Sequence, residues 1–250
     1  MEREEKLLLA RIDDLFHACD KYCVARFSPF LDGAQKRMVE ENYLSISGYQ
    51  TLFFGGYPES ERQMFGVFPE WEDATQSHFP ISVLQITSGY GEPLSHRDYL
   101  GSILSFGIDR NKTGDILIDG NTAYVFASTD ICEYLRENIK KVGNRGVKIE
   151  AVSPSDITVP EKQFELIDAV AASARLDAVL AAVLKLSRAQ AVKLIEAEKV
   201  SIDHKMASDG AKNLTEGCLL SVRGYGRMRL DELGANTRKG RLHIRVKRYL

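Results

Sequence analysis

The chain has 250 residues, of which 44% are hydrophobic and 27% charged. This balance predicts two or three small folded domains and argues against a disordered chain. No apolar run reaches the roughly 20 residues of a membrane helix, and the charged, amphipathic start argues against a secretory signal. Four scattered cysteines indicate reduced thiols rather than a disulfide framework, so we expect a cytoplasmic protein without membrane contact.

The net charge of −2 conceals two parts of opposite sign. From Asp168 to Leu250 there are 16 Lys and Arg against 9 Asp and Glu, whereas Met1 to Ile167 holds 17 against 26. The basic part is the one expected to meet a polyanion, although a basic stretch can equally be a solvated surface.

Residues 1–79 are predicted to form an N-terminal helical α/β segment. Apolar residues at helical spacing predict helices over 2–24 and 32–43. Strand-like runs follow at 50–57 and 63–68, around a turn that contains a proline.

Residues 80–153 show a more regular alternation of strands and helices. Ser95 with Asp98, and Asp130 with Glu133, have the spacing of helix-capping pairs. The predicted elements, in order, are strand 81–86, helix 96–106, strands 115–118 and 122–127, a helix from Asp130 to Val142, and strand 147–152. The order βαββαβ is that of a ferredoxin-like, or RRM-like, domain.

Two aromatic residues, Tyr124 and Phe126, lie on the third strand of this domain. RRM domains carry base-stacking aromatics there, but the accompanying basic and glycine residues are missing. We therefore favour core packing or contact with another domain over stacking on RNA.

The two prolines of residues 153–162 predict a linker, which places a C-terminal domain over 163–250. Its predicted elements are a strand at 164–171, helices at 175–184 and 187–198, strands at 200–203 and 219–223, and a hairpin of 228–233 with 241–249. Ser187 and Gln190 form a further predicted capping pair.

The starts of these two helices are the best candidates for a phosphate-binding site, because helix N-termini offer free N–H groups and partial positive charge. Arg175 and Ser187 lie at these starts, and Arg188 adds a planar donor fork. Alternatively, Asp177 pairs with Arg175 or caps its helix and Ser187 only caps, which we favour for those two residues. For Arg188 and Lys193 we favour RNA contact. Further cationic candidates are Lys199, His204, Lys205, Arg223 and Arg227.

The last strand places Arg245 and Lys247 on the face opposite Leu242, Ile244 and Val246. This row of cations, which follows Arg238 and Lys239, is interpreted as a contact for RNA. The alternative is an exposed sheet edge that cations protect from pairing.

The segment from Arg175 resembles the S-four RNA-binding module. Arg175-Leu176-Asp177, Ser187-Arg188 and Ile195 to Val200 match its pattern in register, while Glu198 replaces the usual glycine and Asp203-His204 replace the usual Asn-Gly turn. Together with the stretch Ser95 to Ile118, this module makes the whole chain similar to the YlmH family of bacterial proteins. The resemblance implies an α+β protein with an RRM-like middle domain and a C-terminal αL-type S-four module.

The resemblance also implies binding to ribosomal RNA or tRNA and a role on large ribosomal subunits that carry stalled peptidyl-tRNA. We expect no catalysis, metal or small-molecule cofactor. One alternative is an RNA-modifying enzyme of the pseudouridine synthase or methyltransferase type, although residues 1–167 show neither a catalytic Asp motif nor a Gly-rich cofactor loop. The other is an adaptor whose acidic part binds protein while its basic part holds the ribosome.

Overall fold

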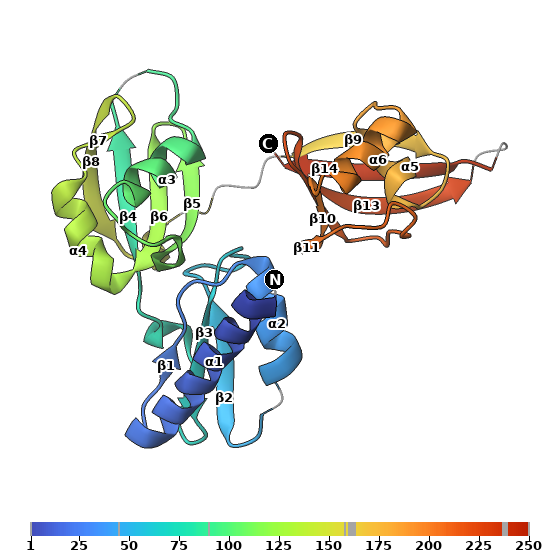
Figure 1. Cartoon of the computed structure of the whole chain (residues 1–250). Coiled ribbons are helices and arrows are strands. Elements are labelled where there is room, and N and C mark those ends of the chain that lie inside the picture. The colour runs from blue at the N-terminus through green and yellow to red at the C-terminus, as the bar shows by residue number, and fades with distance from the viewer. Residues whose placement is uncertain are drawn as a thin grey trace. The chain divides into compact units, whose positions relative to one another are not determined.

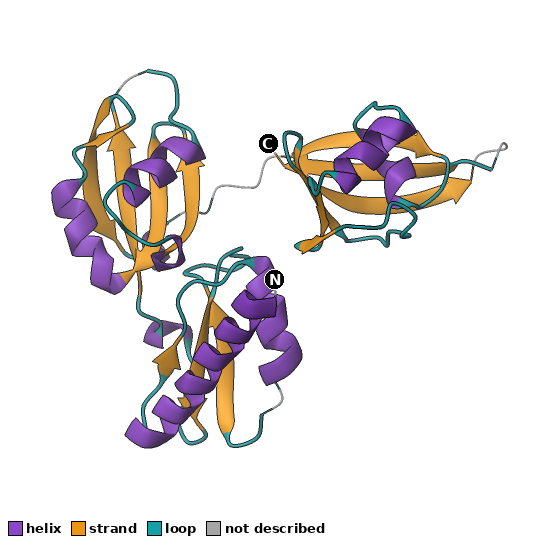
Figure 2. Cartoon of the chain, viewed as in Figure 1, coloured by secondary structure: helices purple, strands orange, loops and turns teal. Residues whose placement is uncertain are grey.

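The computed structural model describes residues 2–44, 46–89, 91–157, 159, 164–236 and 240–249. The chain divides into two compact units, residues 1–160 and 161–250 (Figure 1). Helices and strands occur in both units, which confirms the α+β class (Figure 2). None of the described helices is both long and apolar enough to span a bilayer.

The first unit begins with a small three-stranded sheet. Its strands β1 (Arg26–Phe27), β2 (Tyr49–Phe54) and β3 (Met64–Pro69) lie in the order β1-β3-β2, beside helices α1 (Glu2–Tyr22) and α2 (Gly33–Tyr43). Ile12 and Phe16 of α1 pack on Phe65 and Val67 of β3 to form the core. The side chains of Asp32 and Gln35 cap the start of α2 reciprocally.

The second part of this unit is a five-stranded antiparallel sheet. Its elements are β4 (Ile81–Ser88), α3 (His96–Leu104), β5 (Thr113–Asp119), β6 (Thr122–Ser128), α4 (Thr129–Asn138), β7 (Lys141–Val142) and β8 (Arg145–Val152). The strand order β5-β6-β4-β8-β7 contains the ferredoxin-like arrangement, with β7 added at one edge. Single 3₁₀ turns lie at Gln76–His78, Arg110–Lys112 and Pro154–Asp156.

One predicted capping pair is confirmed and the other is wrong. Ser95 and Asp98 cap α3 reciprocally. At α4 the N-cap is Ser128, whereas Asp130 lies 2.6 Å from Lys112 and Glu133 pairs with Arg136. This helix also ends at Asn138 rather than at Val142, because Val142 belongs to β7 and pairs with Arg145 of β8.

The N-terminal sheet is joined to the five-stranded sheet by hydrogen bonds, most of them partly buried. The Tyr57 hydroxyl donates to the Asp115 carboxylate at 2.7 Å, and Asp115 also accepts the N–H groups of Glu61 and Arg62. The Arg62 guanidinium donates to the carbonyls of Phe30 and Thr113. Burial, followed by the charge of Asp115, raises the pKa of Tyr57, so the phenol stays protonated as a donor.

The second unit is a six-stranded sheet with two short helices. The elements are β9 (Phe164–Ala171), α5 (Leu176–Val183), α6 (Arg188–Glu196), β10 (Val200–Ile202), β11 (Lys205–Met206), β12 (Leu219–Val222), β13 (Gly226–Asn236) and β14 (Leu242–Tyr249). The strand order is β11-β10-β12-β13-β14-β9. Leu176, Leu180 and Ile195 from the helices pack with Leu230 and Val246 from the sheet, so this unit has its own core.

Candidate nucleic-acid interface

A buried carboxylate joins the starts of α5 and α6. Asp177 is only 4% exposed, and it accepts hydrogen bonds from Arg175 at 2.9 and 3.2 Å. Arg188, eleven residues further along, donates to the same carboxylate through Nε and Nη2 at 3.0 to 3.2 Å. The hydrogen bonds from Arg175, and then those from Arg188, hold the pKa of Asp177 below its usual range.

This arrangement fixes two guanidinium groups at the protein surface. The Arg175 and Arg188 side chains remain 39% and 53% exposed although both are bound to Asp177. Each uses Nε and Nη2 for the carboxylate, which leaves the donors on Nη1 for another acceptor. The expected pairing of Asp177 with Arg175 is confirmed, whereas the sequence did not predict that Arg188 shares the same anion.

The N-terminus of α5 is closed rather than open to phosphate. The N–H groups of Leu176 and Asp177 donate to the carbonyls of Lys212 and Gly210 at 2.9 and 3.0 Å. The expectation of free N–H groups at this helix start is therefore wrong, because a loop distant in sequence folds over it.

The N-terminus of α6 carries the predicted capping box. The Ser187 hydroxyl accepts the Gln190 N–H at 3.2 Å, and Gln190 Oε1 accepts the Ser187 N–H at 2.8 Å. Ser187 thus caps the helix, as we favoured. The box does not use the N–H groups of Arg188 and Ala189, the first two residues of the helix.

The positions where this sequence departs from the S-four pattern keep the backbone conformation that glycine would adopt. Glu198 has φ 53°, and Asp203 and His204 have φ 47° and 66°. Ile202 pairs with Lys205 across Asp203-His204, so the two residues form a two-residue hairpin turn with both φ values positive. Asp203 stabilises this turn by accepting the Leu219 N–H at 2.8 Å.

The remaining candidate cations fall into separate groups. Lys199 and Arg223 are neighbours, because the Arg223 N–H donates to the Lys199 carbonyl at 2.8 Å. His204 and Lys205 lie at the opposite end of β10. Arg227 follows the turn after Arg223, and Lys193 is exposed on α6.

Two exposed cations near the helix starts were not singled out from the sequence. Lys185 has φ 54° in the turn between α5 and α6, three residues before Arg188. Lys212 lies on the loop whose carbonyls close the start of α5. The position of Lys185 beside Ser187-Arg188 could have identified it from the sequence. Lys212 could not be identified in this way, because it reaches the start of α5 only through the tertiary fold.

The cations of the last strand are bound to carboxylates. Arg245 pairs with Asp168 at 2.9 Å and Glu232 at 3.3 Å, and Lys247 pairs with Asp231 at 2.7 Å. The alternative of a protected edge is wrong, because β14 pairs with β13 on one side and β9 on the other. Arg238 and Lys239 lie outside the described residues.

The sheet face of the RRM-like domain is partly covered. Phe126 is fully buried and lies against the Tyr57 ring, with 4.9 Å between ring centroids. Val83 and Tyr124 belong to the same cluster, on the face of the sheet away from the α3 and α4 core. Core packing or contact with another domain, which we favoured over stacking, is confirmed for Phe126, which is therefore unavailable for stacking on a base.

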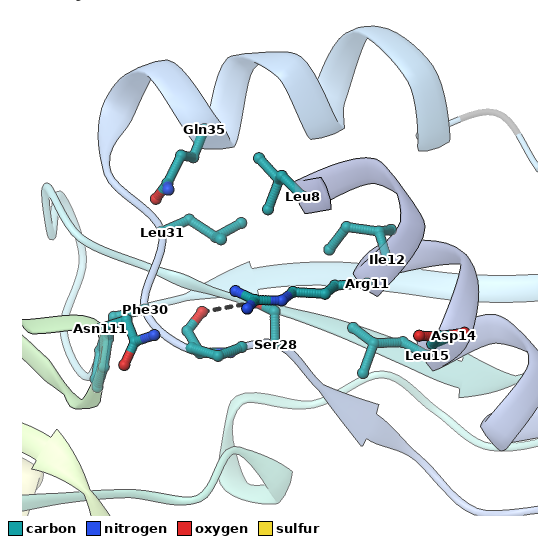
Figure 3. A pocket seen from close by; sticks show the side chains of 11 residues that line it. Leu8, Arg11, Ile12, Asp14, Leu15, Ser28, Phe30, Leu31, Gln35 and Asn111 are labelled. Carbon is teal, nitrogen blue, oxygen red and sulfur yellow. Dashed lines mark hydrogen bonds between the residues drawn. The ribbon is translucent and has the colours of Figure 1, made fainter. Parts of the chain in front are cut away.

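A separate pocket of about 300 Å³ lies in the N-terminal sheet domain, between α1 and the segment before α2 (Figure 3). Leu8, Ile12, Phe30 and Leu31 give it an apolar lining, and Arg11 crosses it. One arginine in a part of the chain rich in carboxylates does not make a polyanion site, so the candidate interface remains in the second unit.

Comparisons with known proteins find one matching family model in each unit. Residues 74–156 match a family model described as a putative RNA-binding domain in YlmH. Residues 174–217 match the S4 domain, which is the S-four module of the sequence analysis. Neither description names a catalytic domain.

The chain is also similar to the ribosome-associated protein quality control protein P2 of Bacillus subtilis (strain 168). The two are 29% identical over 199 residues, which cover 78% of this chain and 77% of that protein. Among solved structures, the cell division protein ylmH from Streptococcus pneumoniae is similar, with a TM-score of 0.54 and 20% identity over 62% of this chain and 95% of that one. The structural likeness shows a shared fold.

Proposed function

Since the chain belongs to the YlmH family and carries an S4 domain, we propose that it is a ribosome-associated RNA-binding protein without catalytic activity. Its S4 domain docks on structured ribosomal RNA or tRNA of the large subunit. The relative from Bacillus subtilis, named for ribosome-associated quality control, supports a role on subunits that carry stalled peptidyl-tRNA.

The observation that carries this proposal is the pair of arginines on Asp177. A guanidinium held by a carboxylate is preorganised, so it loses little side-chain entropy when it binds phosphate. Lys185 and Lys212, exposed on adjoining loops, add charge without sequence specificity. This combination suits a structured RNA that is recognised by its shape and backbone.

The experiment compares the fragments 160–250 and 1–155 for binding to ribosomal RNA over a range of salt concentrations. The first fragment should bind with an affinity that falls steeply with salt, because cations on RNA release counterions. The second should bind much more weakly, since its charge is negative. Equal affinity of the two fragments would contradict the proposal.

The enzyme alternative makes a different prediction. An RNA-modifying enzyme would alter the mass of a nucleotide or its reverse-transcription signature in ribosomal RNA incubated with the full chain. We expect the recovered RNA to be unchanged in both respects, and a modified nucleotide would overturn the non-catalytic assignment.

A further inference from the structure

One end of the N-terminal sheet domain collects large apolar side chains at the surface. Among the described residues up to Phe79, six large apolar side chains are exposed. One of them, Leu7, lies near the start of α1. The other five, here called the apolar end, are Tyr22, Val24, Leu44, Ile46 and Trp71.

Strand register and a cation–π contact place these five residues at the same end. α1 finishes at Tyr22, and the Arg26 guanidinium lies 4.9 Å from the centre of the Tyr22 ring. Arg26 faces Val67 in the antiparallel pair β1–β3, so Val24 and Trp71 extend beyond the same end of the two strands. Tyr49, the first residue of β2, faces Pro69, and Leu44 and Ile46 lie between α2 and this start of β2. Figure 1 shows the end of α1 and the starts of β1 and β2 at the same end of this domain.

Trp71 dominates this surface. It is the only tryptophan of the chain, and it is 72% exposed. Isolated exposed apolar residues are ordinary, but several at one end that include a tryptophan are typical of a protein interface. The immediate neighbours of Trp71 are Glu70, Glu72 and Asp73.

The charge around the apolar end disfavours RNA and favours a basic partner. Residues 1–79 contain 14 Asp and Glu against 8 Lys and Arg. Lys21 and Arg26 lie over the ring of Tyr22, and Glu72 lies 3.6 Å from His78. The carboxylates of Asp20, Glu70, Glu72 and Asp73 still outnumber Lys21 and Arg26. An exposed indole framed by carboxylates attracts a lysine or arginine by cation–π and Coulombic interaction.

We propose that the apolar end binds a lysine- and arginine-rich segment of a ribosomal protein, with Trp71 as its central contact. This inference rests on the proposed ribosome association. It assigns the two ends of the chain to different components of the ribosome, since the second unit binds RNA and the apolar end binds protein.

The test measures binding of the full chain to large ribosomal subunits and to protein-free ribosomal RNA. Trp71→Ser should weaken binding to subunits by about tenfold or more, as expected for an interface hot spot, and should leave binding to free RNA unchanged. Leu7→Ser is the matched control, because it removes an exposed apolar side chain from the other end of α1, and it should alter neither affinity. Glu70→Lys combined with Asp73→Lys should weaken subunit binding as Trp71→Ser does.

A second measurement follows Trp71 directly. Fluorotryptophan incorporated into the chain gives one fluorine resonance, since there is one tryptophan. This resonance should shift when ribosomal proteins extracted free of RNA are added, and it should not shift with protein-free RNA.

Several outcomes would overturn the inference. If Trp71→Ser binds subunits as tightly as the unaltered chain, the apolar end is not a docking site. If Trp71→Ser lowers affinity for free RNA, the surface binds RNA, and if it abolishes self-association, the occupant is a second copy. Failure of the unaltered chain to bind either subunits or RNA would instead overturn the proposed function, and this inference with it.

Discussion

Asp177 organises the candidate interface at the scale of single residues. Its carboxylate is buried, yet both of its guanidinium partners reach the surface. The carboxylate lowers the cost of holding two cations close together, and the two cations keep it ionised. Stability and the proposed RNA binding therefore involve the same three side chains, and substitutions can separate the two contributions.

Arg188→Ala tests the contribution to binding. It should weaken binding to structured RNA by about 1–3 kcal/mol, because it removes a charge-assisted donor. The domain should lose at most about 1 kcal/mol of stability, since Arg188 is half exposed and Arg175 still pairs with Asp177. Filter binding and thermal unfolding measure the two effects. Full retention of affinity, or loss of the folded domain, would refute this role for Arg188.

Asp177→Asn tests the contribution to stability. A neutral amide cannot compensate two guanidinium groups, so the fragment 160–250 should be destabilised by about 1–3 kcal/mol at neutral pH. Because folding lowers the pKa of Asp177, its contribution is complete above the ordinary carboxyl pKa and is lost as the pH falls through the folded value. The stability difference between the two proteins should therefore shrink below about pH 4. A difference that does not change with pH would show that the charge of Asp177 is unimportant.

Glu198 occupies a left-handed backbone position that favours glycine. At φ 53° a residue with a Cβ lowers the free energy of unfolding by about 1 kcal/mol or more through steric strain. Glu198→Gly should therefore stabilise the fragment 160–250 by roughly 0.5–1 kcal/mol. Glu196→Gly is the control, because Glu196 is the last residue of α6, where glycine should destabilise by a similar amount. Denaturant unfolding of both variants gives the comparison. Destabilisation by both would mean that the Glu198 side chain contributes more than its backbone strain costs.

At the scale of elements, the covered face of the middle sheet is the feature that most changes the functional picture. Phe126 lies on β6, on the face away from α3 and α4, where it contacts the segment after β2. An RRM-like domain with this face occupied packs against the segment after β2 and cannot bind bases through Phe126. Its RNA contribution must come from other surfaces.

Gly56→Ala tests how tightly the two sheets pack. A Cβ on Gly56 would lie 2.2 Å from the Phe126 ring, and the residue has φ +105°, so we expect a loss of about 3 kcal/mol or more. Gly48→Ala is the matched control, because φ is +87° there but nothing lies within 4 Å of the added Cβ. The control should cost about 1 kcal/mol in thermal unfolding of the full chain. Equal losses of stability for the two variants would mean that the Phe126 ring moves aside for the added Cβ without a free-energy cost.

At the scale of the whole molecule, charge is divided between the two units. This separation fits the proposed division of contacts, with RNA at the basic unit and protein at the acidic unit. Not every cation of the basic unit has charge to spare, however. Arg175 and Arg188 share the single carboxylate of Asp177, whereas Arg245 and Lys247 face three carboxylates on β9 and β13.

The salt dependence of RNA binding distinguishes cations that pair with a carboxylate from cations that show no such pair among the described residues. Replacing Lys199 and Arg223 by Gln should lower the slope of log affinity against log salt by about two, roughly one for each cation. Replacing Arg245 and Lys247 by Gln should change it by less than about one, because these side chains are already neutralised. Equal changes for the two double variants would show that the last strand also contacts phosphate.

Much of the fold followed from local sequence patterns. Helical periodicity and the capping pairs at Ser95 and Ser187 located their helices correctly, because caps depend on side chains within one turn. Strand β9 was predicted at its observed bounds from its apolar residues. The pattern at Asp130 and Glu133 misled because nearby cations compete for the same carboxylates.

The sequence by itself determined the class of each domain, the charge separation and the arginines at the starts of α5 and α6, since periodicity, composition and motif spacing are local properties. Only the tertiary structure decided which of those groups are available. Gly210 and Lys212 close the start of α5, Asp177 binds both arginines, Tyr57 covers Phe126, and β9 converts the last strand from an edge into an interior strand. Most of these contacts join residues that are distant along the chain. In the case of Asp177, the sequence offers more than one possible partner for the same carboxylate. Local patterns therefore do not specify these contacts.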